Sequence, residues 1–393
     1  MIEFDTEQKK SDLSTVNIKI LGIGGAGGNA VNSMIESGLD EVSFVVANSD
    51  LQALKHSKAP SKVQLGVKAT KGLGSGANPE LGRRSTEEDL EKVMEALGDA
   101  DIVFLVAGMG GGTGSGGAPV IAKALKDRGI LSISVITKPF AFEGKRRMLI
   151  AEHALEELKK EVDTLIVVPN EKLLGLVDRS VSMVDSFKMI NDLLIHSVKS
   201  ISSIISKSGH INVDFADLST IMKGMGLAMM GTGSSTGENR AYEAAKKAIS
   251  SPLLENMDIK SARGVLLNIS GGKNLSLHEI NDAANVIYDE SDKNAHIILG
   301  TVIDEDLGDE VVVSVVATGF QPAITDQASK SYRLESVMPS EKDPILESIE
   351  EKIDSPGQAL KDAVERNDMH DTQEVDVPAF LRKDTSKQKT EDL

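Results

Sequence analysis

The amino-acid sequence predicts an α/β protein in which a parallel-sheet domain is joined by a long central helix to a smaller α/β domain, with a disordered C-terminal tail. Three observations support this fold class. Strand-like and helix-like segments alternate over residues 17–168, and an amphipathic segment at 181–206 is long enough for about seven helical turns. The sequence also becomes acidic and poor in apolar residues after Gly319.

The first half of the chain has the pattern of successive βαβ units. Apolar runs of strand length alternate with segments whose apolar residues recur at helical spacing. Because strands separated by helices pair in parallel, we expect one largely parallel sheet with helices on both faces. The expected strands are 17–24, 42–47, 101–108, 130–137 and 163–168, and the expected helices are 27–37, 80–97, 115–128 and 147–160.

The central helix is predicted from apolar residues spaced three and four apart, namely Val184, Phe187, Leu194, Val198, Ile201 and Ile205. A helix of this length is expected to bridge two domains. Beyond it, the expected helices are 215–224, 238–250 and 276–289, and the expected strands are 226–231, 263–270, 295–302 and 310–318.

The chain is therefore expected to divide into several parts. Between Leu334 and Asp376 there are thirteen acidic residues and four basic ones, a composition that favours disorder. After this linker the peptide VDVPAFLRK (375–383) becomes apolar again, as is typical of a segment that folds on a partner. The expected parts are a flexible N-terminus 1–15, a first domain 16–180, the central helix 181–207, a second domain 208–320, the linker 321–374 and the terminal peptide 375–393.

The composition excludes several functional classes. A net charge of −17 without a basic stripe argues against nucleic-acid binding, and 3% aromatic residues without Trp provide few stacking platforms. The absence of cysteine excludes disulfides, thiolate metal sites and a Cys nucleophile, and the seven scattered histidines indicate no metal site. Without an apolar signal region or the roughly 18 apolar residues that span a bilayer, we expect a cytoplasmic protein with no direct membrane insertion.

Two glycine-rich loops each follow an apolar strand: GGAGGN (24–29) follows 17–24, and MGGGTGSGG (109–117) follows 101–108. Glycine permits close approach of the backbone, and N–H groups at the start of the next helix bind anionic oxygen. In a parallel sheet both loops lie at the carboxyl ends of strands, where ligands bind. We therefore predict a cradle for a run of phosphates, with the second loop contributing Gly110, Gly111, Gly112, Thr113 and Gly114.

A dinucleotide-binding protein is the alternative interpretation. Gly22, Gly24 and Gly27 match G-x-G-x-x-G, and Asp50 lies near the end of the next strand, where such a fold places its ribose carboxylate. The second glycine loop has no role in that fold. A G-x-S-x-G match at residues 233–237 requires only small residues in a turn, and no G-x-x-x-x-G-K-[ST] motif occurs.

Two further loops contain candidate ligand contacts. GLGSGANPELGR (72–83), which includes Gly74, is either a surface loop or a cover over a terminal phosphate. Glu143 and Arg147 lie four residues apart, as in a surface ion pair or in a contact to ribose and phosphate.

Asp214 and Asp217 stand at the start of a predicted helix. Acidic residues are common in the first turn of any helix. The functional interpretation is that the two carboxylates orient a water molecule or help to hold a cation during phosphoanhydride hydrolysis.

Together these motifs resemble the tubulin/FtsZ family, whose bacterial members act in cell division. The resemblance covers about residues 15–320 and the terminal peptide. The matching segments are GGAGGNAVN (24–32), NSDLQAL (48–54), GLGSGANPELGR (72–83), GGGTGSG (110–116), TKPFAFEGKRR (137–147), VVPNEKL (167–173), NVDFADL (212–218) and DVPAFLRK (376–383).

The resemblance implies that the chain binds GTP and GDP. Glu143 and Arg147 would contact ribose and phosphate, and Asn170, Phe187 and Asn191 would surround guanine; many relatives have Asp where Asn191 stands, so base selectivity depends less on this residue. The residues implied to hold phosphates are Gly25, Ala26, Gly27, Gly28, Asn29, Gly112, Thr113 and Gly114.

The resemblance also implies a head-to-tail homopolymer at the division site. Asn212, Asp214 and Asp217 of one subunit would complete GTP hydrolysis on its neighbour, with Mg²⁺ offsetting the triphosphate charge. Asp376–Lys383 would bind membrane-tethering division adaptors. A scaffold that binds nucleotide without hydrolysing it is a further alternative.

Overall fold

The computed structural model describes residues 16–174, 181–206, 211, 213–251, 253–254 and 259–320. The N-terminal segment, Asn212, the acidic linker and the peptide Asp376–Lys383 lie outside these residues, as does the side chain of Phe187. None of the described helices is both long enough and apolar enough to cross a membrane.

The described strands form a single ten-stranded sheet in the order β3-β2-β1-β4-β5-β6-β7-β10-β8-β9. All neighbours pair in parallel except β10, which is antiparallel to both β7 and β8. The strands are β1 (Ile18–Ile23), β2 (Ser43–Asn48), β3 (Ser61–Gln64), β4 (Ile102–Gly108), β5 (Leu131–Lys138), β6 (Thr164–Pro169), β7 (Gly226–Ser235), β8 (Gly264–Gly271), β9 (His296–Ile303) and β10 (Val311–Thr318).

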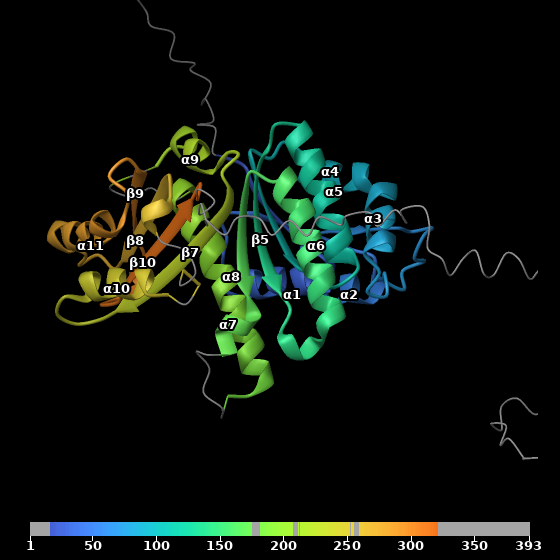
Figure 1. The fold of residues 1–393 in the computed structure, drawn as a ribbon, viewed down its shortest axis with the longest axis horizontal. Coiled ribbons are helices and arrows are strands. Elements are labelled where there is room, and N and C mark those ends of the chain that lie inside the picture. The colour runs from blue at the N-terminus through green and yellow to red at the C-terminus, as the bar shows by residue number, and fades with distance from the viewer. Residues whose placement is uncertain are drawn as a thin grey trace, which may run out of the picture. The chain divides into compact units, whose positions relative to one another are not determined.

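Helices cover both faces of this sheet (Figure 1). The described helices are α1 (Gly24–Glu36), α2 (Leu51–His56), α3 (Pro79–Glu88), α4 (Leu90–Leu97), α5 (Thr113–Asp127), α6 (Lys145–Glu161), α7 (Asn170–Leu174), α8 (Met183–Ser206), α9 (Phe215–Met222), α10 (Arg240–Ile249) and α11 (Leu277–Glu290), with 3₁₀ turns η1 (Ala141–Glu143), η2 (Ile259–Ser261) and η3 (Glu305–Leu307). The predicted α/β class, mostly parallel sheet and central helix are confirmed.

The central helix α8 packs on the sheet where the two halves of the chain meet. Its Leu194, Val198 and Ile201 are buried in one core cluster with residues of both halves, including Ile133 of β5 and Leu266 of β8. Parallel pairing of β6 with β7, from Thr164 opposite Gly226 to Ile166 opposite Ala228, makes the sheet continuous. The two halves therefore share one sheet, and α8 packs across their junction.

The expected helix 80–97 is wrong in one respect, because it is two helices separated at Asp89. The Asp89 carboxylate accepts hydrogen bonds from the backbone N–H groups of Gly66 (2.8 Å) and Val67 (3.3 Å), and it pairs with Lys92. This long-range contact has no sequence signal of its own. The short elements α2, β3 and α7 were not expected either, and β7 continues to Ser235 instead of ending at residue 231.

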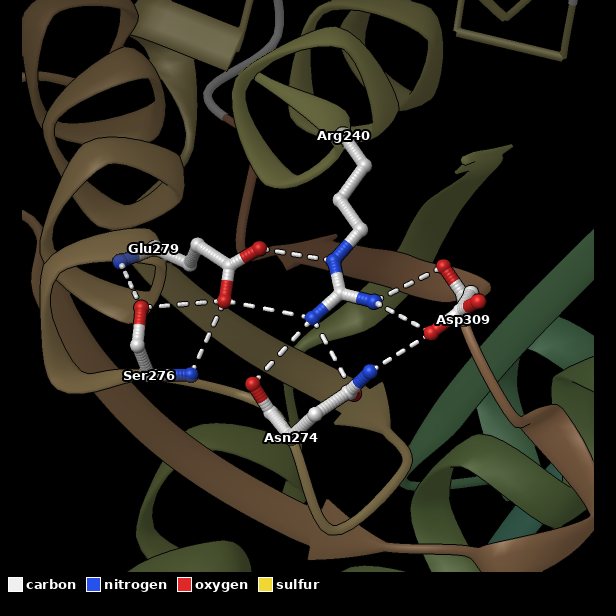
Figure 2. Close-up of polar contacts among 5 residues, drawn as sticks. All are labelled: Arg240, Asn274, Ser276, Glu279 and Asp309. Atoms are coloured by element: carbon white, nitrogen blue, oxygen red, sulfur yellow. Dashed lines mark hydrogen bonds and ion pairs between the residues drawn. The ribbon is translucent and has the colours of Figure 1, made fainter. Parts of the chain in front are cut away.

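A buried arginine ties together the helices of the second half (Figure 2). Arg240, at the start of α10, donates from Nε to Glu279 Oε1 of α11 (2.6 Å) and from Nη1 to the Asp309 carbonyl oxygen (2.8 Å). Nη2 also donates to Asn274 Oδ1 (3.1 Å), and Ser276 caps α11 reciprocally with Glu279. Hydrogen bonds from Arg240, opposed by a smaller effect of burial, lower the pKa of Glu279 from 4.5 to about 2.

Replacing Glu279 by Gln should lower the free energy of unfolding by about 2 kcal/mol, because the buried Arg240 loses its hydrogen-bonded counter-charge and keeps, among the described residues, only the Asp309 carboxylate, 4.0 Å away. The pKa of Glu279 is depressed in the folded state, so its contribution is complete above pH 4.5 and is lost as pH falls toward 2. Urea unfolding across this range should show the wild type and the variant converging at low pH. Asp282→Asn on the same helix is the control, and a Glu279→Gln effect of equal size at pH 7 and pH 2 would contradict the account.

Candidate functional site

The two glycine loops meet at one edge of the sheet. β1 pairs in parallel with β4 from Ile18 opposite Ile102 to Ile23 opposite Ala107, so α1 and α5 begin side by side. A Cβ built on Gly24 would lie 3.1 Å from the Gly114 nitrogen. The first turns of the two helices are therefore in contact, as the sequence predicted from adjacent strand ends.

A cavity of about 580 Å³ opens at this edge. Its floor is formed by the starts of α1 and α5, and its walls by the loop before α3, by η1 with the start of α6, and by the first half of α8. The lining includes Gly25, Ala26, Asn29, Asn48, Asp50, Gly74, Ser75, Gly111, Gly112, Thr113, Gly114, Glu143, Arg147, Asn170 and Asn191.

The helices that form the floor have no side-chain N-caps. The residues preceding α1 and α5 are Ile23 and Gly112, and neither provides a capping hydrogen bond. The neighbouring helices α2 and α3 are capped by Asp50 and Asn78. First-turn N–H groups have no partner within their own helix, so the floor presents backbone donors and two positive helix-dipole ends to the cavity. Such an arrangement favours binding of an anion.

Gly25 and Gly111 are glycines that the fold does not require. Both line the cavity, and a Cβ at either would meet no atom within 4 Å. Neither has a positive φ angle. Every other described glycine except Gly28 has a positive φ or an atom within 3.4 Å of its Cβ position; a Cβ on Gly28 would make only an ordinary 3.5 Å contact with Val46, and Gly28 does not line the cavity. Close approach of a ligand to the backbone is the remaining physical reason for glycine at these two positions.

Other glycines of the two loops serve packing. A Cβ on Gly27 would lie 2.3 Å from the Val106 carbonyl oxygen, and one on Gly114 would lie 2.6 Å from that of Gly108. A Cβ on Gly112 would lie 2.3 Å from Ser75 Oγ. Gly110 has a φ angle of +95°, and a Cβ on it would lie 2.9 Å from the Arg147 carbonyl oxygen. Their glycine identity therefore has a steric cause inside the protein.

Three hydroxyl groups fix the loop before α3 against the start of α5. Thr113 Oγ1 lies 2.6 Å from Ser49 Oγ and 2.9 Å from Ser75 Oγ, and all three side chains are buried. Ser75 and Asn48 were not among the predicted site residues. Ser75 lies inside the predicted loop 72–83, but the sequence gives no indication of its contact with Thr113.

Glu143 and Arg147 form an ion pair at one wall of the cavity. Glu143 Oε1 also accepts a hydrogen bond from the Phe140 N–H (2.9 Å), which holds the 3₁₀ turn η1 in place. The pair lies at the cavity rather than on a remote surface. Arg147 is half exposed, so its guanidinium is accessible to a ligand.

Asn170, at the start of α7, and Asn191, on α8, both line the cavity. Asn170 is buried, and its Oδ1 has no hydrogen-bond partner. An unpaired buried acceptor of this kind is costly unless a ligand or water completes it. Asn191 donates from Nδ2 to Ser33 Oγ (3.1 Å), so its Oδ1 is the atom left for a ligand.

Several predicted site residues do not line this cavity: Gly27, Gly28, Gly110, Asp214 and Asp217. Asp214 caps α9 by accepting from the Asp217 N–H (2.7 Å), and both carboxylates are exposed. The rise of α8 from Asn191 to Ser206 is about 22 Å. Figure 1 shows α9 at the end of the molecule away from α7. Asp214 and Asp217 are therefore remote from the cavity of their own chain.

The motifs of the alternative interpretations have local structural roles. Asp50 lines the cavity, but its Oδ1 accepts from the N–H groups of Gln52 (2.8 Å) and Ala53 (3.3 Å) as a helix cap. Gly233 lies inside β7 against the carbonyl oxygen of Ala244, and Ser235 ends that strand. The G-x-S-x-G match is thus not a strand-to-helix turn.

Comparisons with known proteins identify the same family that the motifs resembled. The sequence model of the Tubulin/FtsZ family GTPase domain matches residues 17–178, and that of the FtsZ family C-terminal domain matches residues 226–321.

Solved structures are also similar to this chain. An empty FtsZ dimer from M. jannaschii is 42% identical with a TM-score of 0.75, over 78% of this chain and 89% of that chain. CetZ1 from Haloferax volcanii, a GDP-bound monomer, is 26% identical with a TM-score of 0.68, over 78% and 95% of the two chains. CetZ2 from the same organism, a GTPγS-bound protofilament, is 24% identical with a TM-score of 0.65, over 89% and 100%, which is a likeness of fold alone.

Replacing Gly111 by Ala should weaken binding of a phosphate-bearing ligand about tenfold without changing stability, because the added methyl group enters only the cavity. Binding is measured by calorimetry with guanosine di- and triphosphates, and stability by urea unfolding. Asn285→Ala, on an exposed face of α11, is the control for both. Unchanged nucleotide affinity in Gly111→Ala would remove the ligand as the reason for glycine at this position.

Proposed function

The chain belongs to the tubulin/FtsZ family, and from this premise we propose that it is a GTPase that assembles head-to-tail into filaments of the bacterial division machinery. The observation that carries the proposal is the cavity floor, where two uncapped helix starts and two glycines without a structural role face the same space. The chain has a GTPase domain of this family, and the remaining steps concern what the cavity and the rest of the chain do with GTP.

The phosphates are proposed to lie on the floor. Gly25, Ala26 and Asn29 of the first loop and Gly111 to Gly114 of the second line it, and their backbone N–H groups would donate to phosphate oxygens. Gly74 lies across the cavity, where the loop before α3 would close over the terminal phosphate. Gly27 and Gly110 would then support the loops through their packing rather than through contact with the ligand, and Gly28 does not line the cavity.

The nucleoside is proposed to lie along η1 and α8. Glu143 would accept from ribose hydroxyls and Arg147 would face phosphate or base. The unpaired Asn170 Oδ1 and the free Oδ1 of Asn191 are acceptors for the N–H donors of guanine. Phe187 is proposed to complete this side as the resemblance implies.

Mg²⁺ fits this site as a partner of the triphosphate. The described residues include no group of three His, Asp or Glu side chains that could hold a metal alone. Mg²⁺ is commonly held by substrate phosphates, one or two protein oxygens and water, and it offsets phosphate charge when bound.

Hydrolysis is proposed to be completed by the next subunit. Asp214 and Asp217 are exposed and lie remote from the cavity of their own chain, so an acidic contribution from them requires another copy. A contact that places α9 of one subunit on the cavity of the next is heterologous and does not close, which generates a filament. Asn212 would join these carboxylates, and Asp376–Lys383 would bind the adaptors that concentrate filaments at the division site.

Asp214→Asn should keep GTP binding and folding but reduce GTP turnover at least tenfold, because Asn still caps α9 while the carboxylate is removed. Phosphate release is measured against protein concentration. Mixing this variant with Gly111→Ala should restore part of the activity. The unaltered cavity of the Asp214→Asn subunit can then meet the unaltered Asp214 of the Gly111→Ala subunit.

Two results would contradict the trans arrangement. Turnover per subunit that does not depend on protein concentration would exclude it, and so would full activity of Asp214→Asn. The family match and the role of Asp50 as a helix cap disfavour the dinucleotide interpretation of Gly22, Gly24 and Gly27. Competition between GTP and NAD for the cavity separates these two functions.

A further inference from the structure

The two edges of the ten-stranded sheet carry opposite charge. No acidic residue occurs between Asp50 and Glu80, although the chain as a whole has a net charge of −17. That stretch forms α2, the edge strand β3 and the loop that follows, and its five lysines are all exposed: Lys55, Lys58, Lys62, Lys68 and Lys71. We define these five lysines as the basic edge. Lys58 pairs with Glu36, and the other four have no ion-pair partner among the described residues.

The opposite edge, at β9 and α11, is acidic. Asp282, Asp289 and Asp292 are exposed and have no ion-pair partner within the described ranges, and Glu290 pairs with Lys260; Lys293 is the one lysine among residues 276–296, and it is also exposed. Ala283, Ala284 and Ile287 bury the inner face of α11, so its outer face carries the carboxylates together with Asn285 and Tyr288. We define Asp282, Tyr288, Asp289 and Asp292 as the acidic edge.

The basic edge has a groove, and the acidic edge has an exposed aromatic side chain. A groove of about 440 Å³ follows β3, with Lys62 and Lys92 beside the exposed Val67 and with Glu95 as its acidic residue. Tyr288 is 46% exposed on α11 between the carboxylates. An exposed tyrosine has an apolar ring and a polar tip, which suits a groove with an apolar floor and cationic walls.

We propose that the basic edge of one copy binds the acidic edge of a second copy, so that filaments of this chain associate side by side. This inference rests on the proposed function. Figure 1 shows α11 and α2 at opposite sides of the described sheet, while α7 and α9 lie at its other two ends. The line that joins the two charged edges is therefore transverse to the proposed filament, in which the cavity of one subunit would meet α9 of the next. A contact between opposite edges is heterologous and continues from filament to filament.

The contact should depend strongly on salt. The charges on both edges are exposed, so ions screen them over about 10 Å at 0.1 M and about 3 Å at 1 M salt. Each pair alone is weak, but a filament repeats the contact along its length and multiplies it. Single subunits are therefore expected to associate through these edges less than filaments do.

Disulfide cross-linking tests the contact directly, because the chain has no cysteine of its own. One copy carries Ala96→Cys in the groove, and a second carries Asn285→Cys on the outer face of α11. Mixed with GTP at low salt and mildly oxidised, this pair should cross-link several-fold more than Ala96→Cys with Lys159→Cys on α6. The yield should fall as salt is added.

Charge reversal identifies the residues responsible. Lys62→Glu with Lys68→Glu in the first copy should abolish the selective cross-link, and so should Asp282→Lys with Asp289→Lys in the second. Combining the two reversed copies should restore it, since opposite charges face each other again. Lys123→Glu with Lys159→Glu, on α5 and α6, gives the same change in net charge and should leave the yield unaltered.

The outcomes separate this proposal from the proposed function. Suppose that filaments form with normal GTP turnover but Ala96→Cys cross-links equally to positions 285 and 159. This result would overturn the side-by-side contact alone. Failure of the two charge-reversed copies to recover the cross-link would do the same. Selective, charge-dependent cross-linking without GTP turnover or filaments would support the contact and defeat the proposed function.

Discussion

Unpaired backbone N–H groups at the starts of α1 and α5 are the constraint on which the site depends. Because β1 and β4 are adjacent and parallel, both helices begin at the same edge and their first turns touch. Neither start is capped by a side chain, while the flanking α2 and α3 are. Donors and dipole ends gathered in this way favour an anion with several oxygens, and the glycines allow it to reach the backbone.

The rest of the fold determines which elements surround the floor of the cavity. Pairing of β6 with β7 makes one sheet of both halves, and α8 crosses their junction with its first half at the cavity and its far end toward α9. The Arg240 network holds α10, α11 and the loop before β10 together at the other side of the sheet (Figure 2). A rigid sheet with an anion site at one end and exposed carboxylates at the other suits repeated end-to-end contact.

Much of this arrangement could be predicted because its signals are local. Apolar runs ending in glycine identified β1 and β4, and the spacing of Leu194, Val198 and Ile201 identified α8. The unpredicted features depend on distant partners. Asp89 separates α3 from α4, and its carboxylate accepts a hydrogen bond from the distant Gly66 N–H. The Ser75 hydroxyl is hydrogen-bonded to that of Thr113, 38 residues away in the sequence. The sequence also could not separate Gly111, which has no steric role, from Gly112, which packs against Ser75.

A crystal structure with GTPγS tests the central claim most directly. The account predicts terminal phosphate oxygens at about 2.7–3.2 Å from the backbone nitrogens of Gly111 to Gly114, with the other phosphates against the first turn of α1. The base should then lie beside Asn170, whose Oδ1 gains a donor. A bound nucleotide whose phosphates lie away from both helix starts, with those N–H groups facing solvent, would contradict it.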